Sequence, residues 1–235
     1  MSLLERMGSS HMQVRQQGRD ASQGDPARIM DETEIDADLA ANSDSAGQMT
    51  KAIAFAKSKG ASIIGLTGTG QSVGVSTISQ HLAQSYASFG KRTLLVDVSK
   101  VSDLPSEASS GAQANAGLAD YATLISGNVG VVDLLGIPSG PPNEQALRAM
   151  FAVAVEQGLT IIVDLPPIVR ADGRPSPAFA TVGALCDIAF VICPTGGVSA
   201  SELKACHATS DVAGVNIAGI ILNDWHLPLH SLLPA

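Results

Sequence analysis

A repeated alternation of short aliphatic runs with amphipathic stretches is the feature that most restricts what this chain can fold into. Aliphatic runs of this kind are typical of parallel strands buried on both faces, and the stretches between them have the apolar spacing of helices. Strands are predicted at 62–67, 92–97, 160–164, 188–192 and 217–222, and helices at 76–89, 143–156, 176–184 and 199–213. The pattern therefore predicts an α/β fold, a three-layer sandwich with a mostly parallel central sheet.

The alternation does not extend over the whole chain. Residues 13–47 contain almost no large apolar side chain, so this stretch cannot bury enough surface to offset its ordering entropy. We therefore expect a disordered or loosely helical arm over residues 1–47, with a short helix starting the domain at 51–56. The domain itself is expected to cover 48–224, followed by a short tail over 225–235.

Charge and cysteine content restrict the partners and the compartment. The chain has 14 Lys and Arg against 22 Asp and Glu, a net charge of −8, which disfavours nucleic-acid binding. Three cysteines without metal or redox spacing fit a reducing cytoplasm. No signal-peptide core and no membrane-spanning apolar stretch is visible, so we expect a cytoplasmic protein.

The glycine-rich segment 67–77, between the first strand and the first helix, allows three interpretations. Gly68, Gly70 and Gly74, with Asp97 at the end of the next strand, are similar to a dinucleotide-binding loop. An NAD(P)-dependent short-chain dehydrogenase would also need a Tyr followed four residues later by Lys, and neither tyrosine of the chain has one. This interpretation therefore lacks its catalytic pair.

The second interpretation is the nucleophile elbow of a hydrolase, because residues 70–74 match G-x-S-x-G. Asp187 and His207 follow in the order that such a triad requires. However, a hydrolase of this type places several strands before the elbow, and the roughly 60 residues before it are mostly unsuited to strands. The elbow is therefore the least favoured of the three.

The third interpretation is a phosphate-binding loop, G-x-x-x-x-G-K-[ST], with Thr69 at the first glycine and Val75 at the lysine. Asp97 and Asp164 each end an aliphatic strand, where a carboxylate can position a metal ion or a water. We take both as candidate catalytic or vestigial residues, with Thr77 and Asp164 as ligands if Mg²⁺ binds. The candidate nucleotide-binding residues in the loop are Gly68, Gly70, Ser72, Gly74, Ser76 and Thr77.

Taken together, these segments resemble the cytoplasmic ATPase domains of bacterial tyrosine-kinase-like proteins of capsule and exopolysaccharide synthesis, within the ParA/MinD-type P-loop class. The resemblance covers about 49–223. Its most specific part is 161–167, which is close to the family's acidic strand followed by two prolines. The other matching segments are 66–83, 94–97, 117–121 with 126–127, 186–193 and 219–223. The resemblance implies a P-loop NTPase fold, and it implies that Asn223 faces an adenine base.

The chain departs from this family at several positions. Val75 replaces the phosphate-loop lysine, Gly70 stands where ParA/MinD relatives carry a second lysine, and Ser99 replaces the second Asp of the acidic strand. The arginines of an oligomerising E-x-x-R-x-x-R helix are absent near 44–50, and residues 225–235 contain no tyrosine. We therefore expect no autophosphorylation of this tail.

These losses favour a degenerate ATPase-like protein that binds ATP or ADP with Mg²⁺ weakly and acts as a regulator or scaffold. The family resemblance implies a role in exopolysaccharide or capsule production and export. It also implies a membrane polysaccharide co-polymerase (chain-length protein) as partner, a place at the inner membrane through that partner, and leaves a homodimer open.

Three alternatives stay open. The first is an active ATPase or kinase with a displaced cation from Lys100, Arg170 or Arg174, although solvated loop charge is the favoured interpretation of all three residues. The second is a ParA/MinD-type positioning ATPase. The third, and less favoured, is an NAD(P)-binding oxidoreductase.

Overall fold

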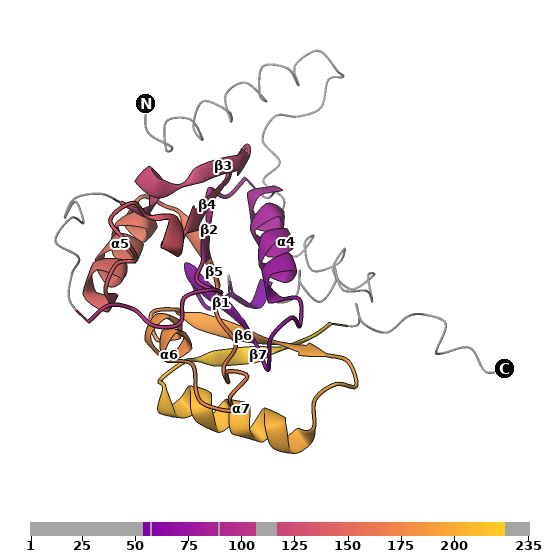
Figure 1. The fold of residues 1–235 in the computed structure, drawn as a ribbon. Helices are drawn as coiled ribbons and strands as arrows, with labels where there is room; N and C mark the ends of the chain where they lie inside the picture. Colours follow the sequence, from indigo (N-terminus) through magenta and orange to yellow (C-terminus); the bar gives the residue numbers. More distant parts are fainter. Residues whose placement is uncertain (1–53, 57, 89, 107–116, 224–235) are drawn as a thin grey trace, which may run out of the picture.

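A computed structural model describes residues 54–56, 58–88, 90–106 and 117–223 (Figure 1). The predicted arm over 1–47 and the predicted tail over 225–235 lie outside these residues, as does the start of the helix predicted at 51–56. Residues 54–56 and 58 are helical. The structure of the domain can therefore be compared with the sequence between residues 54 and 223.

The centre of the domain is a seven-stranded sheet in the order β3-β4-β2-β5-β1-β6-β7 (Figure 1). All neighbouring strands are parallel except β3 and β4, which are antiparallel. The strands are β1 (Ile63–Gly68), β2 (Thr93–Asp97), β3 (Thr123–Ser126), β4 (Val129–Asp133), β5 (Thr160–Asp164), β6 (Ile188–Pro194) and β7 (Ile217–Asn223). This topology confirms the predicted α/β fold with a mostly parallel sheet.

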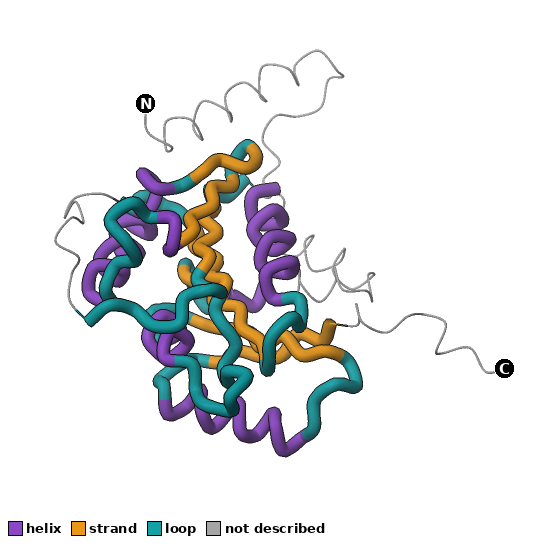
Figure 2. The backbone as a smooth tube through the Cα atoms, in the orientation of Figure 1, coloured by secondary structure: helices purple, strands orange, loops and turns teal. Residues whose placement is uncertain are grey.

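Helices cover both faces of this sheet (Figures 1 and 2). They are α4 (Val75–Ser88), α5 (Glu144–Glu156), α6 (Pro177–Gly183) and α7 (Ala200–Val212). Two separate apolar clusters show the three layers. Leu82 of α4 packs in one cluster with Leu95 and Ile162, whereas Phe151 and Phe179 pack in the other. Because side chains alternate along a strand, the neighbours of Leu95 belong to the opposite cluster.

Side-chain caps fix where the helices of the second face begin. The side chains of Asn143, Ser176 and Ser199 accept hydrogen bonds from the backbone of the first turns of α5, α6 and α7. Capping residues of these types satisfy backbone N–H groups that have no partner inside the helix. The four predicted helices agree with α4 to α7 to within a residue at each end.

The hairpin of β3 and β4 is the part of the sheet that the sequence did not predict. A 3-10 turn at Leu118–Tyr121 precedes it and another at Leu134–Gly136 follows it. β4 is interior, because it pairs with both β3 and β2, and Val132 is fully buried. Its run of residues is interrupted by Gly130, and Ile125 of β3 is exposed, so the aliphatic pattern of the other strands is missing here.

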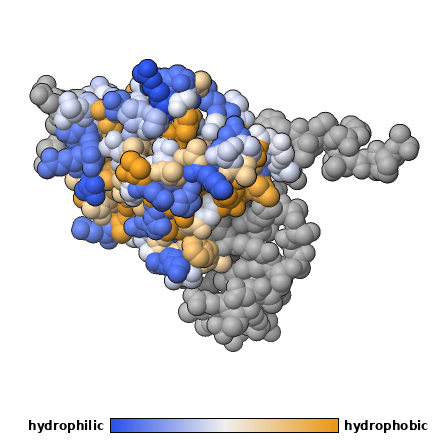
Figure 3. Space-filling model, turned by 90° about the horizontal axis from the view of Figure 1, so that it is seen from below, coloured by the Kyte–Doolittle hydropathy of each residue, from blue (hydrophilic) through white to orange (hydrophobic). Residues whose placement is uncertain are grey.

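The exposed surface mixes polar and apolar residues. On the face seen from below, small orange patches lie between blue residues (Figure 3). In the part of the chain that the structure describes, no helix has the length and apolar character needed to cross a membrane.

Candidate phosphate-binding site

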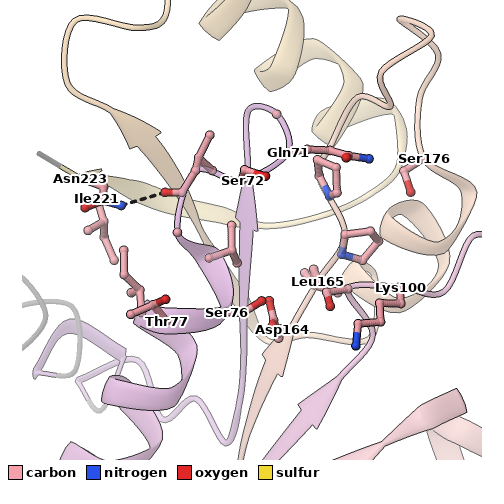
Figure 4. A pocket seen from close by; sticks show the side chains of 18 of the residues that line it. Gln71, Ser72, Ser76, Thr77, Lys100, Asp164, Leu165, Ser176, Ile221 and Asn223 are labelled. Atoms are coloured by element: carbon pink, nitrogen blue, oxygen red, sulfur yellow. Dashed lines mark hydrogen bonds between the residues drawn. The ribbon is translucent and has the colours of Figure 1, made fainter. Parts of the chain in front are cut away.

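A cavity of about 820 Å³ lies beyond the carboxyl ends of the parallel strands (Figure 4). Its lining comes from the loop after β1 and the start of α4, the loop after β2, the segment after β5, and the end of β7. Segments far apart in the sequence meet here because parallel strands present their carboxyl ends at the same edge of the sheet. This is the edge at which the sequence predicted a site.

Two residues of the loop after β1 have a left-handed backbone conformation. Gly74 has a φ of +90° and Ser72 has a φ of +59°, both in the left-handed region. Val73 and Val75 turn back onto the end of β1, since a Cβ added at Gly68 would meet a methyl group of each. Gly68 therefore leaves room for the side chains of Val73 and Val75. It is not among the residues that line the cavity.

Backbone N–H groups are concentrated where this loop enters α4. The first intrahelical bond runs from Ile78 N to the carbonyl of Gly74, at 3.0 Å. In the described structure, the N–H groups of residues 73–77 donate to no protein acceptor. The first turn of α4 also contains no acidic residue, so the positive end of the helix dipole is not neutralised there. This arrangement suits an anion such as a phosphate.

Asn223, at the end of β7, is tied to the same loop. Its amide Nδ2 donates to the carbonyl oxygen of Val73 at 2.8 Å, across 150 residues of sequence (Figure 4). A Cβ at Gly74 would collide with that amide nitrogen. Asn223 therefore fixes the loop against the edge of the sheet. Asn223 lies on the cavity wall, and its contact with an adenine base stays a prediction.

Asp164, at the end of β5, is the carboxylate on the cavity wall, and its residue is only 3% exposed. Burial is the main cause that raises the pKa of Asp164 to about 6. A hydrogen bond from the Ser76 hydroxyl lowers this pKa, and the charge of Asp97 raises it. Its Oδ1 atom has no hydrogen-bond partner among the described residues. A buried carboxyl oxygen without a partner requires a proton or a cation.

Hydrogen bonds hold the end of β5, and the segment that follows it, to the end of β1. The hydroxyl of Thr67 donates to the carbonyl of Pro166 at 2.7 Å, and the N–H of Leu165 donates to the carbonyl of Leu66 at 2.8 Å. Thr67 is fully buried. The glycine loop and the segment with the two prolines are therefore held in one rigid arrangement.

Asp97, at the end of β2, has a different environment from the one expected. Its Oδ1 accepts hydrogen bonds from both the backbone N–H and the hydroxyl of Ser99, at 2.9 and 2.6 Å. Asp97 is not among the residues that line the cavity. Its role as a catalytic or metal-positioning residue stays a prediction, and the structure gives it a local turn partner instead.

Ser76 and Thr77 diverge at the start of α4. Ser76 lies next to Asp164, whereas Thr77 points to the side on which Ile221 and Asn223 lie (Figure 4). Successive helical residues are rotated by about 100°, so only one of two neighbours can face the carboxylate. From the sequence, Thr77 is the expected partner of Asp164 for Mg²⁺, whereas the geometry favours Ser76.

The residues present fit a bound Mg²⁺ of the kind that P-loop proteins use. The unpartnered oxygen of Asp164 and the hydroxyl of Ser76 are hard oxygen ligands on one wall of the cavity. Mg²⁺ commonly takes one or two protein oxygens together with waters and phosphate oxygens. Among the described residues no group of three His, Cys, Asp or Glu side chains forms a metal site, so the protein would supply few ligands itself.

Two cations also line the cavity, Lys100 after β2 and Arg170 after β5. Both side chains are exposed, and neither forms an ion pair within the described part of the chain. Arg174, the third candidate cation, does not line the cavity; its carbonyl accepts a hydrogen bond from the N–H of Arg170. The sequence analysis did not single out Gln71, His81 and Ser176 as site residues, yet they are part of the lining.

Most of the loop residues selected from the sequence meet in this cavity. Those on its wall are Gly70, Ser72, Gly74, Ser76, Thr77, Asp164 and Asn223. Gly68 and Asp97 are the two that the structure places outside the lining. The chemistry available is therefore binding of a phosphate chain and of a metal ion, without a lysine in the loop.

Two solved structures share the fold. The kinase domain of the Escherichia coli tyrosine kinase ETK superposes with a TM-score of 0.54 over 88% of this chain and 85% of that domain, at 20% identity. The cell division protein MinD of Aquifex aeolicus superposes with a TM-score of 0.51 over 73% of this chain and 74% of its own, at 12% identity. These similarities confirm the predicted P-loop NTPase fold.

The sequence comparisons are more specific. No family model matches the chain. The tyrosine-protein kinase CpsD of Streptococcus agalactiae is 30% identical over 178 residues, which cover 68% of this chain and 74% of the relative. The aligned part covers more than two thirds of both chains. The chain therefore belongs to the CpsD family of bacterial tyrosine-protein kinases.

Proposed function

We propose that this protein is a nucleotide-binding but catalytically weakened member of its family, which acts as a regulatory or scaffolding partner in capsule or exopolysaccharide production and export. The observation that supports this most is the presence of Val75 in place of the phosphate-loop lysine. The Val75 side chain packs over Gly68 at the end of β1. The loop thus keeps its shape but lacks its charge.

Loss of this charge has a large effect on phosphoryl transfer. Catalysis of this reaction depends on positioning and on electrostatic stabilisation of the transferred group. One ammonium group about 4 Å from a negative charge contributes on the order of 4 kcal/mol at an effective dielectric constant near 20. Since each ~1.4 kcal/mol in the barrier changes the rate about tenfold, turnover falls by orders of magnitude.

Nucleotide binding depends less on that lysine. The N–H groups of residues 73–77 and the start of α4 suit the phosphates, and Asp164 with Ser76 suits Mg²⁺. When bound, Mg²⁺ would neutralise charge on the phosphates. Asn223 is fixed at the cavity wall, where it would lie beside a base. These features support binding of ADP or ATP without efficient hydrolysis.

The partner in this proposal is a membrane polysaccharide co-polymerase. This part of the proposal rests on membership of the CpsD family and on the series of motifs shared with capsule-synthesis ATPase domains. The protein would then work on the cytoplasmic side of the membrane, held there by the co-polymerase, as a monomer or as a homodimer.

The test is a single-turnover assay with Mg-ATP and purified protein. The wild type is expected to bind ATP without measurable hydrolysis or self-phosphorylation, and Val75→Lys is expected to bind more tightly. Rapid turnover by the wild type that disappears in Asp164→Asn would contradict the proposal. Co-purification with a co-polymerase, compared between the wild type and Asp164→Asn, tests the partner separately.

A second candidate function is an active ATPase or kinase that uses a displaced cation. Lys100 and Arg170 favour it, because both line the cavity without a carboxylate partner in the described part of the molecule. In this case the wild type would turn over ATP, and the same assay distinguishes the two candidates directly.

A further inference from the structure

We propose that Lys100, in the loop after β2, supplies the cation that binds the phosphate chain of a nucleotide in place of the lysine missing from the glycine loop. This inference rests on the proposed nucleotide binding and names the residue that makes it feasible. In this proposal the positive charge comes from the loop after β2 and not from the loop after β1.

The first argument is the charge of the cavity wall. Among the described residues of the wall, Lys100 and Arg170 are the cations and Asp164 is the carboxylate, and the charge of Asp97 also acts on Asp164. The whole chain, in contrast, has a net charge of −8. Two cations gathered at one cavity of an acidic protein favour an anion there over the remaining surface.

The second argument is that the local sequence leaves Lys100 without a carboxylate partner. The residue before it is Ser99, at the position of the second Asp in the acidic strand pattern. The Ser99 hydroxyl and N–H both bind Asp97, which therefore stays off the cavity wall. The loss of a negative charge at position 99 thus accompanies the loss of a positive charge at position 75.

The third argument is the direction of the side chain. Lys100 lies on the side of the pocket that holds Asp164 and Ser76, and its amino group is turned toward that side (Figure 4). The side chain is exposed and forms no ion pair among the described residues. A long flexible side chain of this kind can reach a phosphate oxygen as a point charge.

Two sets of groups without partners indicate where the ligand lies. The N–H groups of residues 73–77 lack protein acceptors in the described structure and can donate to an anion. The buried Oδ1 of Asp164 lacks a donor among the described residues and suits a proton or a metal ion that accompanies the phosphates. A diphosphate or triphosphate with its counter-ion satisfies both sets, and a cavity of about 820 Å³ has room for a nucleotide.

The test compares calorimetric titrations of ADP and of pyrophosphate into the wild type, Lys100→Gln and Lys91→Gln. Lys91 is the matched control, because it is an exposed lysine next to β2 at the amino-terminal end of the strand, away from the cavity. Lys100→Gln is expected to raise the Kd of both ligands about tenfold or more, because a charge-assisted contact is lost. Lys91→Gln is expected to leave both Kd values unchanged.

A rescue experiment separates a charge effect from a structural one. Val75→Lys, introduced into Lys100→Gln, is expected to restore pyrophosphate binding, since it returns a cation to the loop. Equal affinity of the wild type and Lys100→Gln would overturn the role of Lys100 and leave nucleotide binding intact. Absence of any ADP or pyrophosphate binding by the wild type would overturn this inference together with the nucleotide binding in the proposed function.

Discussion

At the scale of single residues, the glycine loop depends on a few positions that tolerate no side chain. Gly74 combines a φ of +90° with close approach of the Asn223 amide. Gly70, four residues earlier in the same loop, has open space around it and no positive φ. Two glycines that look equivalent in the sequence therefore have different physical reasons to be there.

The first prediction compares these two glycines. Gly74→Ala is expected to lower the free energy of unfolding by about 2 kcal/mol, because it adds left-handed strain and displaces Asn223. Gly70→Ala is the matched control and is expected to change it by less than about 0.5 kcal/mol. Urea unfolding followed by circular dichroism measures both, and equal stabilities for the two variants would show that the loop is not held as described.

The second prediction concerns Asp164 and pH. Burial raises its pKa in the folded protein to about 6 from the ordinary value of 3.8, so between these values the folded state retains a proton that the unfolded state has lost. The carboxylate therefore destabilises the fold fully above pH 6, and this effect is relieved as the pH falls through 6 toward 4. Asp164→Asn is expected to be more stable than the wild type at pH 7.5, by on the order of 2 kcal/mol.

This difference should shrink as the pH falls toward 4, where the folded-state carboxyl is protonated and the unfolded-state carboxyl is close to its own pKa of 3.8. Asp103→Asn, an exposed carboxylate in the loop after β2, controls for the loss of one negative charge. Thermal or urea unfolding across pH 4–8 gives the values. A stability difference between the wild type and Asp164→Asn that does not change with pH would contradict the assigned burial.

At the scale of elements, the loop, α4 and β7 behave as one unit. The bond from Asn223 to the Val73 carbonyl joins the last strand of the sheet to the turn before the first helix of the site. Loops of this kind open locally when few contacts hold them.

The third prediction tests that link. Asn223→Ala is expected to raise amide hydrogen exchange in residues 71–75 and to lower the free energy of unfolding by about 1 kcal/mol, since one buried acceptor loses its donor. Asn216→Ala is a matched control, because Asn216 bonds the carbonyl of Asp187 before β6 and lies outside the cavity lining. If both variants raise exchange in the loop equally, Asn223 has no specific role there.

At the scale of the whole molecule, the cavity differs in charge from the chain as a whole, which has an excess of acidic residues. The net charge of −8 opposes binding to any extended polyanion, whereas the cavity wall includes two cations, Lys100 and Arg170. We therefore expect the protein to bind small anions in the cavity but not extended anionic polymers.

The fourth prediction follows from that contrast. Duplex DNA is expected to show no binding at physiological salt, because an acidic surface releases no counterions from the phosphate backbone. Fluorescence anisotropy with a labelled duplex measures this, and a basic DNA-binding domain is the positive control. Binding that weakens steeply with added salt would reveal a basic surface that the composition does not indicate.

The sequence alone determined the order of the main elements and the edge at which the site lies. Five strands and four helices followed from hydrophobic periodicity, because burial on one or two faces leaves a direct trace in the residue pattern. The hairpin of β3 and β4 left no such trace, since Gly130 and the exposed Ile125 interrupt the pattern. The predicted P-loop fold follows from motifs at the ends of the predicted strands.

Tertiary structure alone decided which of these residues face each other. It paired Ser76 instead of Thr77 with Asp164, directed Asp97 to Ser99, and brought Lys100 onto the cavity wall. The physical reason is that side-chain direction depends on helical rotation and on loop path, and neither is written in the spacing of residues. The chain specified that the loop lacks its lysine, while the fold decided which other cation lies close enough to replace it.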